Sequence, residues 1–212
     1  MKLTGIMETG ALEPGRSSRH GTMIGPQLYA PYHQHIFCFR LDLDIDGTSN
    51  SVFEVDMRPE PLGPDNPYGN AWRAVPTLFR RESEAQRLID ASAARTWKVV
   101  NPDVLNEFGG PVGYCLVPGP TATMLADPSS SVARRAVFAS KHLWVTPYAP
   151  DELHAAGDYP NQHPGGDGLP RWTSADRPLE REDVVLWHTF AVTMIHGPRI
   201  GRSCRSSTRG SP

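Results

Sequence analysis

The chain has 212 residues, of which 39% are hydrophobic and 21% are charged, and its formal net charge is −2. This composition is typical of a water-soluble globular protein, and the nearly balanced charge gives no basic surface for nucleic acid. No apolar run is long enough to cross a bilayer, so we expect neither a nucleic-acid partner nor a membrane partner.

The numbers of proline, glycine and cysteine residues indicate the fold class, and the N-terminal residues indicate the cellular location. Twenty-one prolines and 19 glycines predict a mainly β fold of short strands joined by turns. The three cysteines, at positions 38, 115 and 204, are far apart and predict neither a disulfide framework nor a cysteine zinc site. Residues 1–15 lack the apolar segment of a secretory signal, so we expect a cytoplasmic location by default.

The clearest predicted strand covers residues 32–46. From residue 41 onward, leucine or isoleucine alternates with aspartate, which places apolar and acidic side chains on opposite faces of a half-buried strand. Residues 51–56 alternate as well, so we predict a hairpin whose loop is residues 46–50.

The remaining elements are predicted from shorter patterns. Residues 83–94 are the best helix candidate, and residues 201–212 form a polar tail that is too poor in apolar residues to order itself. Further strands are predicted at residues 71–81, 96–100, 112–117, 143–146 and 183–195.

Two histidines on the first strand form a candidate metal site. His33 and His35 are separated by one residue, and such residues of an extended chain point to the same face. Two imidazoles on one strand and a third from elsewhere commonly hold copper or zinc. The spacing by itself leaves open a pair of surface or hydrogen-bonded histidines.

The residues around this pair resemble the catalytic domain of copper amine oxidases. The resemblance extends in order over residues 1–200, and it implies that the chain is a portion of a large antiparallel β-sandwich followed by a separate tail, residues 201–212. The segments that carry it are residues 28–37 (Leu-Tyr-Ala-Pro-Tyr-His-Gln-His-Ile-Phe), 40–47, 81–85, 125–136, 143–148, 157–163, 165–170 and 183–190.

The resemblance implies that His33 and His35 bind copper and that a third histidine precedes a Pro-Arg pair. Counting back from Pro198 gives His196, whereas counting forward from Trp187 gives Met194. We favour His196, because an insertion of two residues keeps a strand side chain on the same face. Imidazole is also a better Cu(II) ligand than a thioether.

A second cation site is implied by the same resemblance. Its ligands would be the carboxylates of Asp42 and Asp183 and the backbone carbonyls of Leu43 and Val184. Oxygen ligands of this kind suit calcium or manganese. The alternative interpretation is a solvated acidic strand face.

The family oxidises primary amines to aldehydes with dioxygen, releasing ammonia and hydrogen peroxide, and the resemblance implies a homodimer in the complete protein. Its cofactors are copper and topaquinone, a quinone made from a tyrosine in an Asn-Tyr-Asp/Glu motif. None of the six tyrosines of this chain lies in such a motif, and no residue matches the family's catalytic aspartate.

We therefore expect a copper-binding fragment of an oxidoreductase that is inactive alone and has no catalytic residue of its own. Two alternatives remain open: a non-catalytic copper-binding β protein, and one half of a split amine oxidase.

The tail also differs from the family, which continues after Pro-Arg with an acidic pair and Trp-Pro-Val-Met-Pro. If residues 200–210 are encoded by GC-rich codons, reading that DNA one base earlier gives nearly the missing family segment. We therefore expect a frameshift near Ile200.

Overall fold

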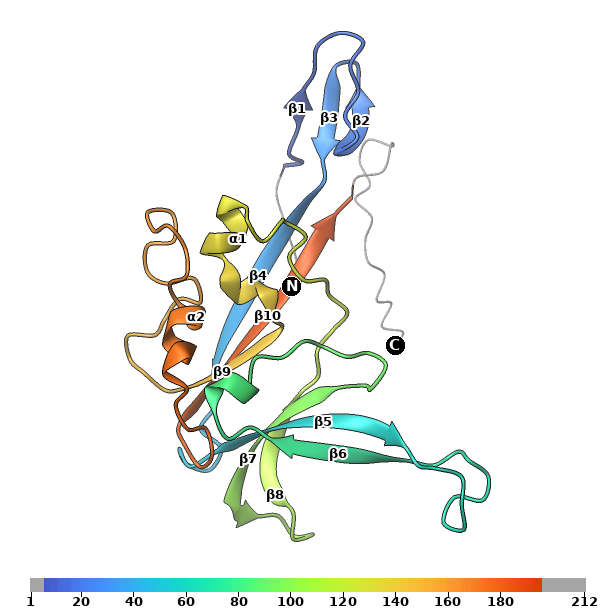
Figure 1. Ribbon diagram of the computed structural model, residues 1–212, viewed down its shortest axis with the longest axis vertical. Helices are drawn as coiled ribbons and strands as arrows, with labels where there is room; N and C mark the ends of the chain where they lie inside the picture. Colours follow the sequence, from blue (N-terminus) through green and yellow to red (C-terminus); the bar gives the residue numbers. More distant parts are fainter. Residues whose placement is uncertain (1–5, 196–212) are drawn as a thin grey trace. The chain divides into compact units, whose positions relative to one another are not determined.

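The computed structural model describes residues 6–195, which are mainly β-structured (Figure 1). The chain divides into two compact units, one of residues 36–190 and the other of the residues before and after that range. Every strand pairing described is antiparallel. The helices among the described residues are all too short to span a lipid bilayer.

The first unit contains a small antiparallel sheet and the start of a long strand. The order in this sheet is β1 (Gly10–Ala11), β3 (Leu28–Pro31) and β2 (Gly21–Gly25). A Cβ atom at Gly21 would lie 2.4 Å from the Ala30 carbonyl oxygen, so only glycine allows this close approach of two strands. The sheet leads directly into β4 (His33–Asp42).

The second unit contains two larger sheets. One has the order β4, β10 (Val184–Met194) and β9 (Leu143–Pro147), although the ends of β4 and β10 belong to the first unit. The other has the order β6, β5, β7 and β8, with bounds Trp72–Leu78, Ser51–Pro59, Thr96–Leu105 and Pro111–Leu116.

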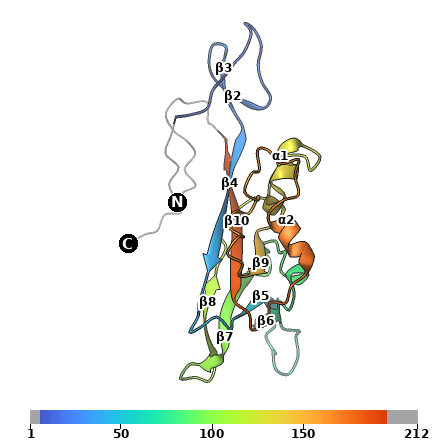
Figure 2. The same cartoon turned by 90° about the vertical axis from the view of Figure 1, so that its left-hand side faces the viewer.

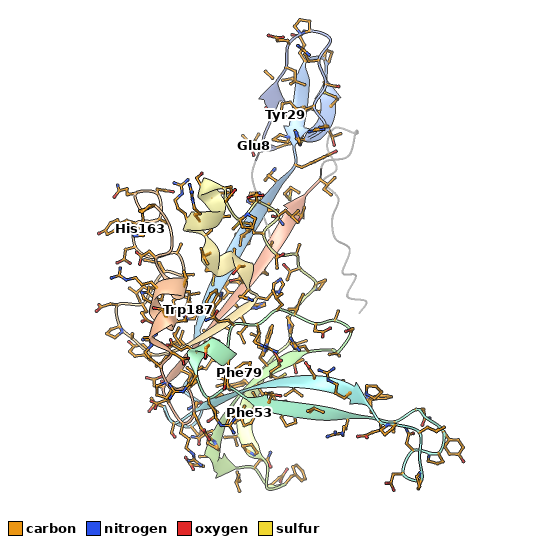
Figure 3. All side chains as sticks on the ribbon, viewed as in Figure 1. Glu8, Tyr29, Phe53, Phe79, His163 and Trp187 are labelled. Carbon is orange, nitrogen blue, oxygen red and sulfur yellow. The ribbon has the colours of Figure 1, made fainter. Side chains whose placement is uncertain are left out.

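Alternate side chains of β9 and β10 enter two different hydrophobic clusters, because neighbouring residues of a strand point to opposite faces. Leu143, Val145 and Leu186 join the cluster that also contains Phe79, Trp97 and Val99 of the four-stranded sheet and its loops. Trp144 and Trp187 face the other way and pack with Leu169. Figure 3 labels Phe79 and Trp187, one from each cluster.

Two short helices accompany the smaller cluster. The helix α2 (Leu169–Trp172) contributes the fully buried Leu169 to it, and α1 (Ser131–Arg135) is a single turn capped by the Ser130 hydroxyl. Figure 2 shows both helices on the same side of the sheet formed by β9 and β10. The opposite side of this sheet faces the larger cluster.

The strands predicted from hydrophobic patterns are confirmed, with shifted ends, but the predicted hairpin is wrong. The strands β4 and β5 belong to different sheets, so the segment between them connects one sheet to the other. Asn50 shapes it: its side chain accepts a hydrogen bond from the Ile45 N–H at 3.2 Å and donates one to the Gly47 carbonyl at 2.6 Å. Asp46 and Gly47 take the positive φ angles that the bend requires.

The predicted helix at residues 83–94 is also wrong. Only Glu82–Glu84 form a single 3-10 turn. The Arg87 backbone then pairs with Leu143 at the start of β9, with N–O distances of 2.8 and 3.0 Å. Hydrogen bonds to a distant strand replace the local bonds that a helix needs.

Candidate functional site

His33 and His35 are brought together as their spacing predicts. Both lie on β4, and their Nε2 atoms are 3.1 Å apart, with ring planes inclined at 73°. Two imidazole nitrogens bound to one ion at about 2.0 Å, with an angle near 100° between the bonds, would lie about 3 Å apart. The donor pair therefore fits a single transition-metal ion.

The backbone fixes which nitrogen of His33 is available to a metal. Its Nδ1 lies 3.0 Å from the Pro31 carbonyl oxygen, and a carbonyl can only accept, so Nδ1 carries the proton. The lone pair of His33 then lies on Nε2, facing His35. A ligand histidine whose other N–H is bound to a backbone carbonyl is the usual arrangement in metal sites.

The contact between the two rings also has a metal-free interpretation. Since Nε2 of His33 has no proton, the 3.1 Å contact is a hydrogen bond donated by Nε2–H of His35. A metal ion at this point would take the place of that proton, leaving His35 protonated at Nδ1 only.

The strand β10 lies beside the pair. The Gln34 side chain, between the two histidines in sequence, donates a 3.1 Å hydrogen bond to the Thr193 hydroxyl. Met194, the last residue of β10, is half-buried and is adjacent in sequence to Thr193, so its side chain points to the other face of the strand. His196, the favoured third ligand, lies outside the described residues.

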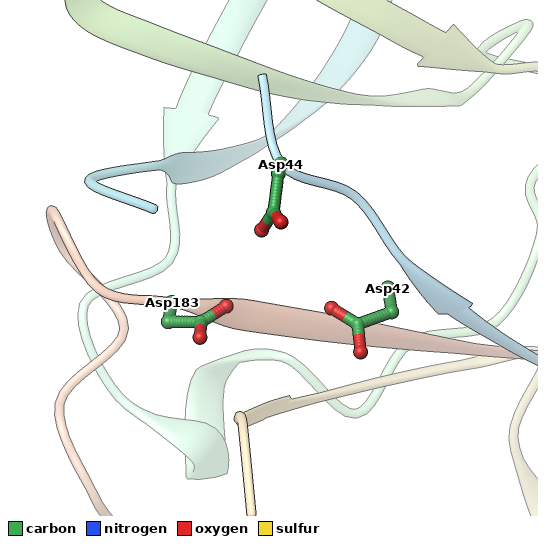
Figure 4. Close-up of side chains that lie close together, drawn as sticks. All are labelled: Asp42, Asp44 and Asp183. Carbon is green, nitrogen blue, oxygen red and sulfur yellow. The ribbon is translucent and has the colours of Figure 1, made fainter. Parts of the chain in front are cut away.

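An acidic cluster forms in the second unit at the end of β4 and the start of β10. One carboxylate oxygen from each of Asp42, Asp44 and Asp183 lies within 4.8 Å of the other two (Figure 4). Asp42 and Asp183 are predicted ligands. Asp44 was missed, although the same one-residue spacing that pairs His33 with His35 also pairs it with Asp42.

Asp183 is the least exposed of the three aspartates. Its pKa is raised by burial and by the negative charges of Asp42 and Asp44, while Arg40 acts in the opposite direction. Arg40 itself contacts the Asp42 carboxylate at 3.0 Å. Three carboxylates gathered at one place are a suitable oxygen-ligand set for a hard cation.

His188 has a packing role. It is only 8% exposed, and its Nδ1 donates to the His142 carbonyl at 2.9 Å. Burial lowers its pKa, so that the ring stays neutral.

Comparison with known proteins identifies the family. The model of the copper amine oxidase enzyme domain matches residues 1–202. Histamine oxidase of Arthrobacter globiformis is 50% identical over 198 residues, which are 93% of this chain and 28% of that protein. A peroxisomal copper-containing diamine oxidase of Nicotiana tabacum is 45% identical over 205 residues, 94% of this chain and 26% of the relative.

A solved structure extends the likeness to three dimensions. The copper-containing benzylamine oxidase of Hansenula polymorpha matches with a TM-score of 0.86 and 30% identity, over 94% of this chain and 31% of that chain. The chain thus spans between a quarter and a third of the length of these relatives. It belongs to the copper amine oxidase family, of whose enzyme domain it contains a part.

Proposed function

We propose that this chain supplies the copper-binding part of a primary-amine oxidase. The observation that carries the proposal is the 3.1 Å approach of the His33 and His35 Nε2 atoms, with His33 oriented by the Pro31 carbonyl. Copper at this position would supply the redox and oxygen chemistry of the family. The residues of this chain bind and orient the ion.

We propose His196 as the third copper ligand. Met194 is directed away from the face of Thr193, which holds Gln34. In the sequence, His196 directly precedes the Gly-Pro-Arg segment that corresponds to the Pro-Arg pair of the family. Imidazole completes a three-nitrogen set that Cu(II) prefers to one containing a thioether. Met194 remains the competing candidate for this position.

Copper titration of the 212-residue chain tests the site. We expect one Cu(II) per chain, with an electron paramagnetic resonance spectrum that shows nitrogen coupling. His33→Ala should weaken binding by more than about 100-fold, beyond the range of outer-shell changes. Comparing His196→Ala with Met194→Leu identifies the third ligand.

His154→Ala is the matched control, because His154 is an exposed histidine of the second unit. It should leave the copper affinity unchanged, and circular dichroism should show that all variants keep the wild-type β signal. Stoichiometric nitrogen-coordinated copper in His33→Ala would refute the proposed site.

We propose that the 212-residue polypeptide does not oxidise amines by itself, since none of its tyrosines lies in the cofactor motif. Relatives named for histamine and benzylamine support a primary amine as the substrate of the complete enzyme. We also propose that the complete enzyme is a homodimer and that it is located in the cytoplasm. Hydrogen peroxide produced by copper-loaded chain and benzylamine would disprove inactivity.

Co-expression with a family segment that carries the Asn-Tyr-Asp/Glu motif separates the two remaining alternatives. Quinone absorbance and peroxide production in the mixture would indicate a split enzyme. Copper binding without either would indicate a non-catalytic copper protein.

A further inference from the structure

A cationic pocket lies in the second unit, between α1 and the loop that precedes α2. Its volume is about 450 Å³, and it is lined by Ser131, Arg134, Arg135, His163 and Pro164. Figure 3 labels His163 on this loop. None of these residues belongs to the histidine pair or to the aspartate cluster, so the pocket needs a separate explanation.

The two guanidinium groups of the pocket are not neutralised by described carboxylates. Every arginine–carboxylate pair within 4.0 Å in residues 6–195 involves another arginine. Within the described part of the chain, the Arg135 side chain donates only to Ser131, to its carbonyl at 3.1 Å and to its hydroxyl at 3.4 Å. Two adjacent positive charges therefore line one depression.

The other polar groups of the pocket can also donate hydrogen bonds. Nδ1 of His163 accepts a 3.1 Å hydrogen bond from the Gly165 N–H, so the ring carries its proton on Nε2. The Ser131 oxygen accepts from Arg135, which leaves the hydroxyl proton to be donated. Four of the five lining residues therefore carry a hydrogen-bond donor, and the two arginines give the pocket a positive charge.

The backbone holds the two walls of the pocket together. The Gly166 N–H donates to the Arg134 carbonyl at 3.1 Å, which fastens the loop to α1. Gly165 has a φ of +125°, and a Cβ atom there would lie 2.5 Å from the same carbonyl oxygen. A glycine is therefore required for this close packing of the loop against α1.

We propose that this pocket binds phosphate, either as the free ion or as a phosphate monoester. Arginine side chains form paired, charge-assisted hydrogen bonds with such oxyanions. Two guanidinium groups match the double negative charge of phosphate better than the single charge of a carboxylate. The proposal does not depend on the copper site.

Calorimetric titration of the 212-residue chain, freed of metal ions on a chelating resin, tests this at low ionic strength. Inorganic phosphate should bind at one site per chain, and acetate should bind at least tenfold more weakly. Arg134→Gln and Arg135→Gln should each weaken phosphate binding about tenfold. Comparison with phenyl phosphate distinguishes the free ion from a monoester as the better ligand.

Arg171→Gln is the matched control, because Arg171 is an exposed arginine outside the pocket, 3.5 Å from Asp167. It should bind phosphate like the wild type. Absence of saturable phosphate binding, or equal losses in all three variants, would overturn the proposal.

A measurement on the wild-type chain covers the case in which a variant fails to fold. Phenylglyoxal modifies accessible arginines, and mass spectrometry locates each modified residue. Phosphate should slow modification of Arg134 and Arg135 several-fold and leave Arg171 unaffected. Equal rates with and without phosphate at all three positions would refute the proposed site.

Discussion

Glu82 has no exposed side-chain surface, and its Oε1 receives two hydrogen bonds from the Arg177 guanidinium, at 3.0 and 2.7 Å. Its other oxygen accepts from the Arg177 backbone N–H at 2.7 Å. These bonds fasten the 3-10 turn at Glu82–Glu84 to the segment that leads into β10. The pair thus holds together two parts of the chain that are almost a hundred residues apart in sequence.

Replacing Glu82 by Gln should lower the free energy of unfolding by about 1–3 kcal/mol, because the half-buried Arg177 guanidinium would lose one of its two carboxylate partners and keep only Glu152. Urea unfolding followed by tryptophan fluorescence measures the change. Glu180→Gln is the control: Glu180 lies 3.9 Å from Arg80, and both side chains are largely exposed. It should change stability by less than about 0.5 kcal/mol. Equal effects of the two substitutions would contradict the role assigned to Glu82.

Asn50→Ala should lower the free energy of unfolding by about 1–3 kcal/mol, since the Ile45 N–H would lose its acceptor in a buried place. Asn50 is 1% exposed, and its backbone also exchanges hydrogen bonds with Glu182 at 2.9 and 3.0 Å. Thermal unfolding measures the loss. The exposed Asn70, replaced by Ala, should have an effect below about 0.5 kcal/mol.

The pH dependence of stability should contain a contribution from Asp56. Two hydrogen bonds from Arg95, at 2.8 and 2.9 Å, lower the pKa of this carboxyl in the folded protein. A lowered folded pKa contributes stability above the unfolded value of about 3.9, and this contribution is lost as the pH falls through the folded value. Stability should therefore decrease as the pH falls below about 4.

Asp56→Asn should be less stable than the wild type at pH 7, and its stability should decrease less steeply below about pH 4. Urea unfolding at several pH values from about 2.5 to 7 gives both curves. Parallel curves over the whole range would show that Asp56 does not contribute to the acid sensitivity.

Local periodicity predicted the strands well but not their partners. The alternation of leucine or isoleucine with aspartate determines which faces of residues 41–46 are buried, and Ile45 is indeed only 5% exposed. Which strand pairs with which depends on contacts between distant residues. Instead of a hairpin, the chain passes from one sheet to another between β4 and β5. The Asn50 side chain accepts a hydrogen bond from the Ile45 N–H in this connection, and the Asn50 backbone pairs with Glu182.

The segment 83–94 shows how tertiary contacts override local propensity. The Arg87 side chain makes two hydrogen bonds to Glu54, at 2.9 and 2.7 Å, while its backbone pairs with Leu143. No local pattern contains these partners. By contrast, the close approach of His33 and His35 follows from their spacing alone. The hydrogen bond from His33 to the Pro31 carbonyl could not be predicted from the sequence, because it depends on the local backbone geometry.

The three aspartates of the acidic cluster should respond to a divalent cation. Burial and the charges of Asp42 and Asp44 raise the pKa of Asp183 in the folded protein. The stability linked to a raised pKa is present at low pH and is lost as the pH rises through the folded value. At pH 7 the ionised cluster therefore destabilises the fold, and a bound calcium or manganese ion would remove the repulsion.

Calcium or manganese at about 100 times its Kd should thus raise the free energy of unfolding by about 2.7 kcal/mol at pH 7, with a higher Tm. Asp183→Asn should have a higher Tm than the wild type without added cation, because one negative charge is gone, and should gain little when the cation is added. Asp158→Asn, an exposed aspartate outside the cluster, should gain as much as the wild type. Equal gains in all three proteins would mean that the cation binds elsewhere, and the cluster would then be a solvated acidic face.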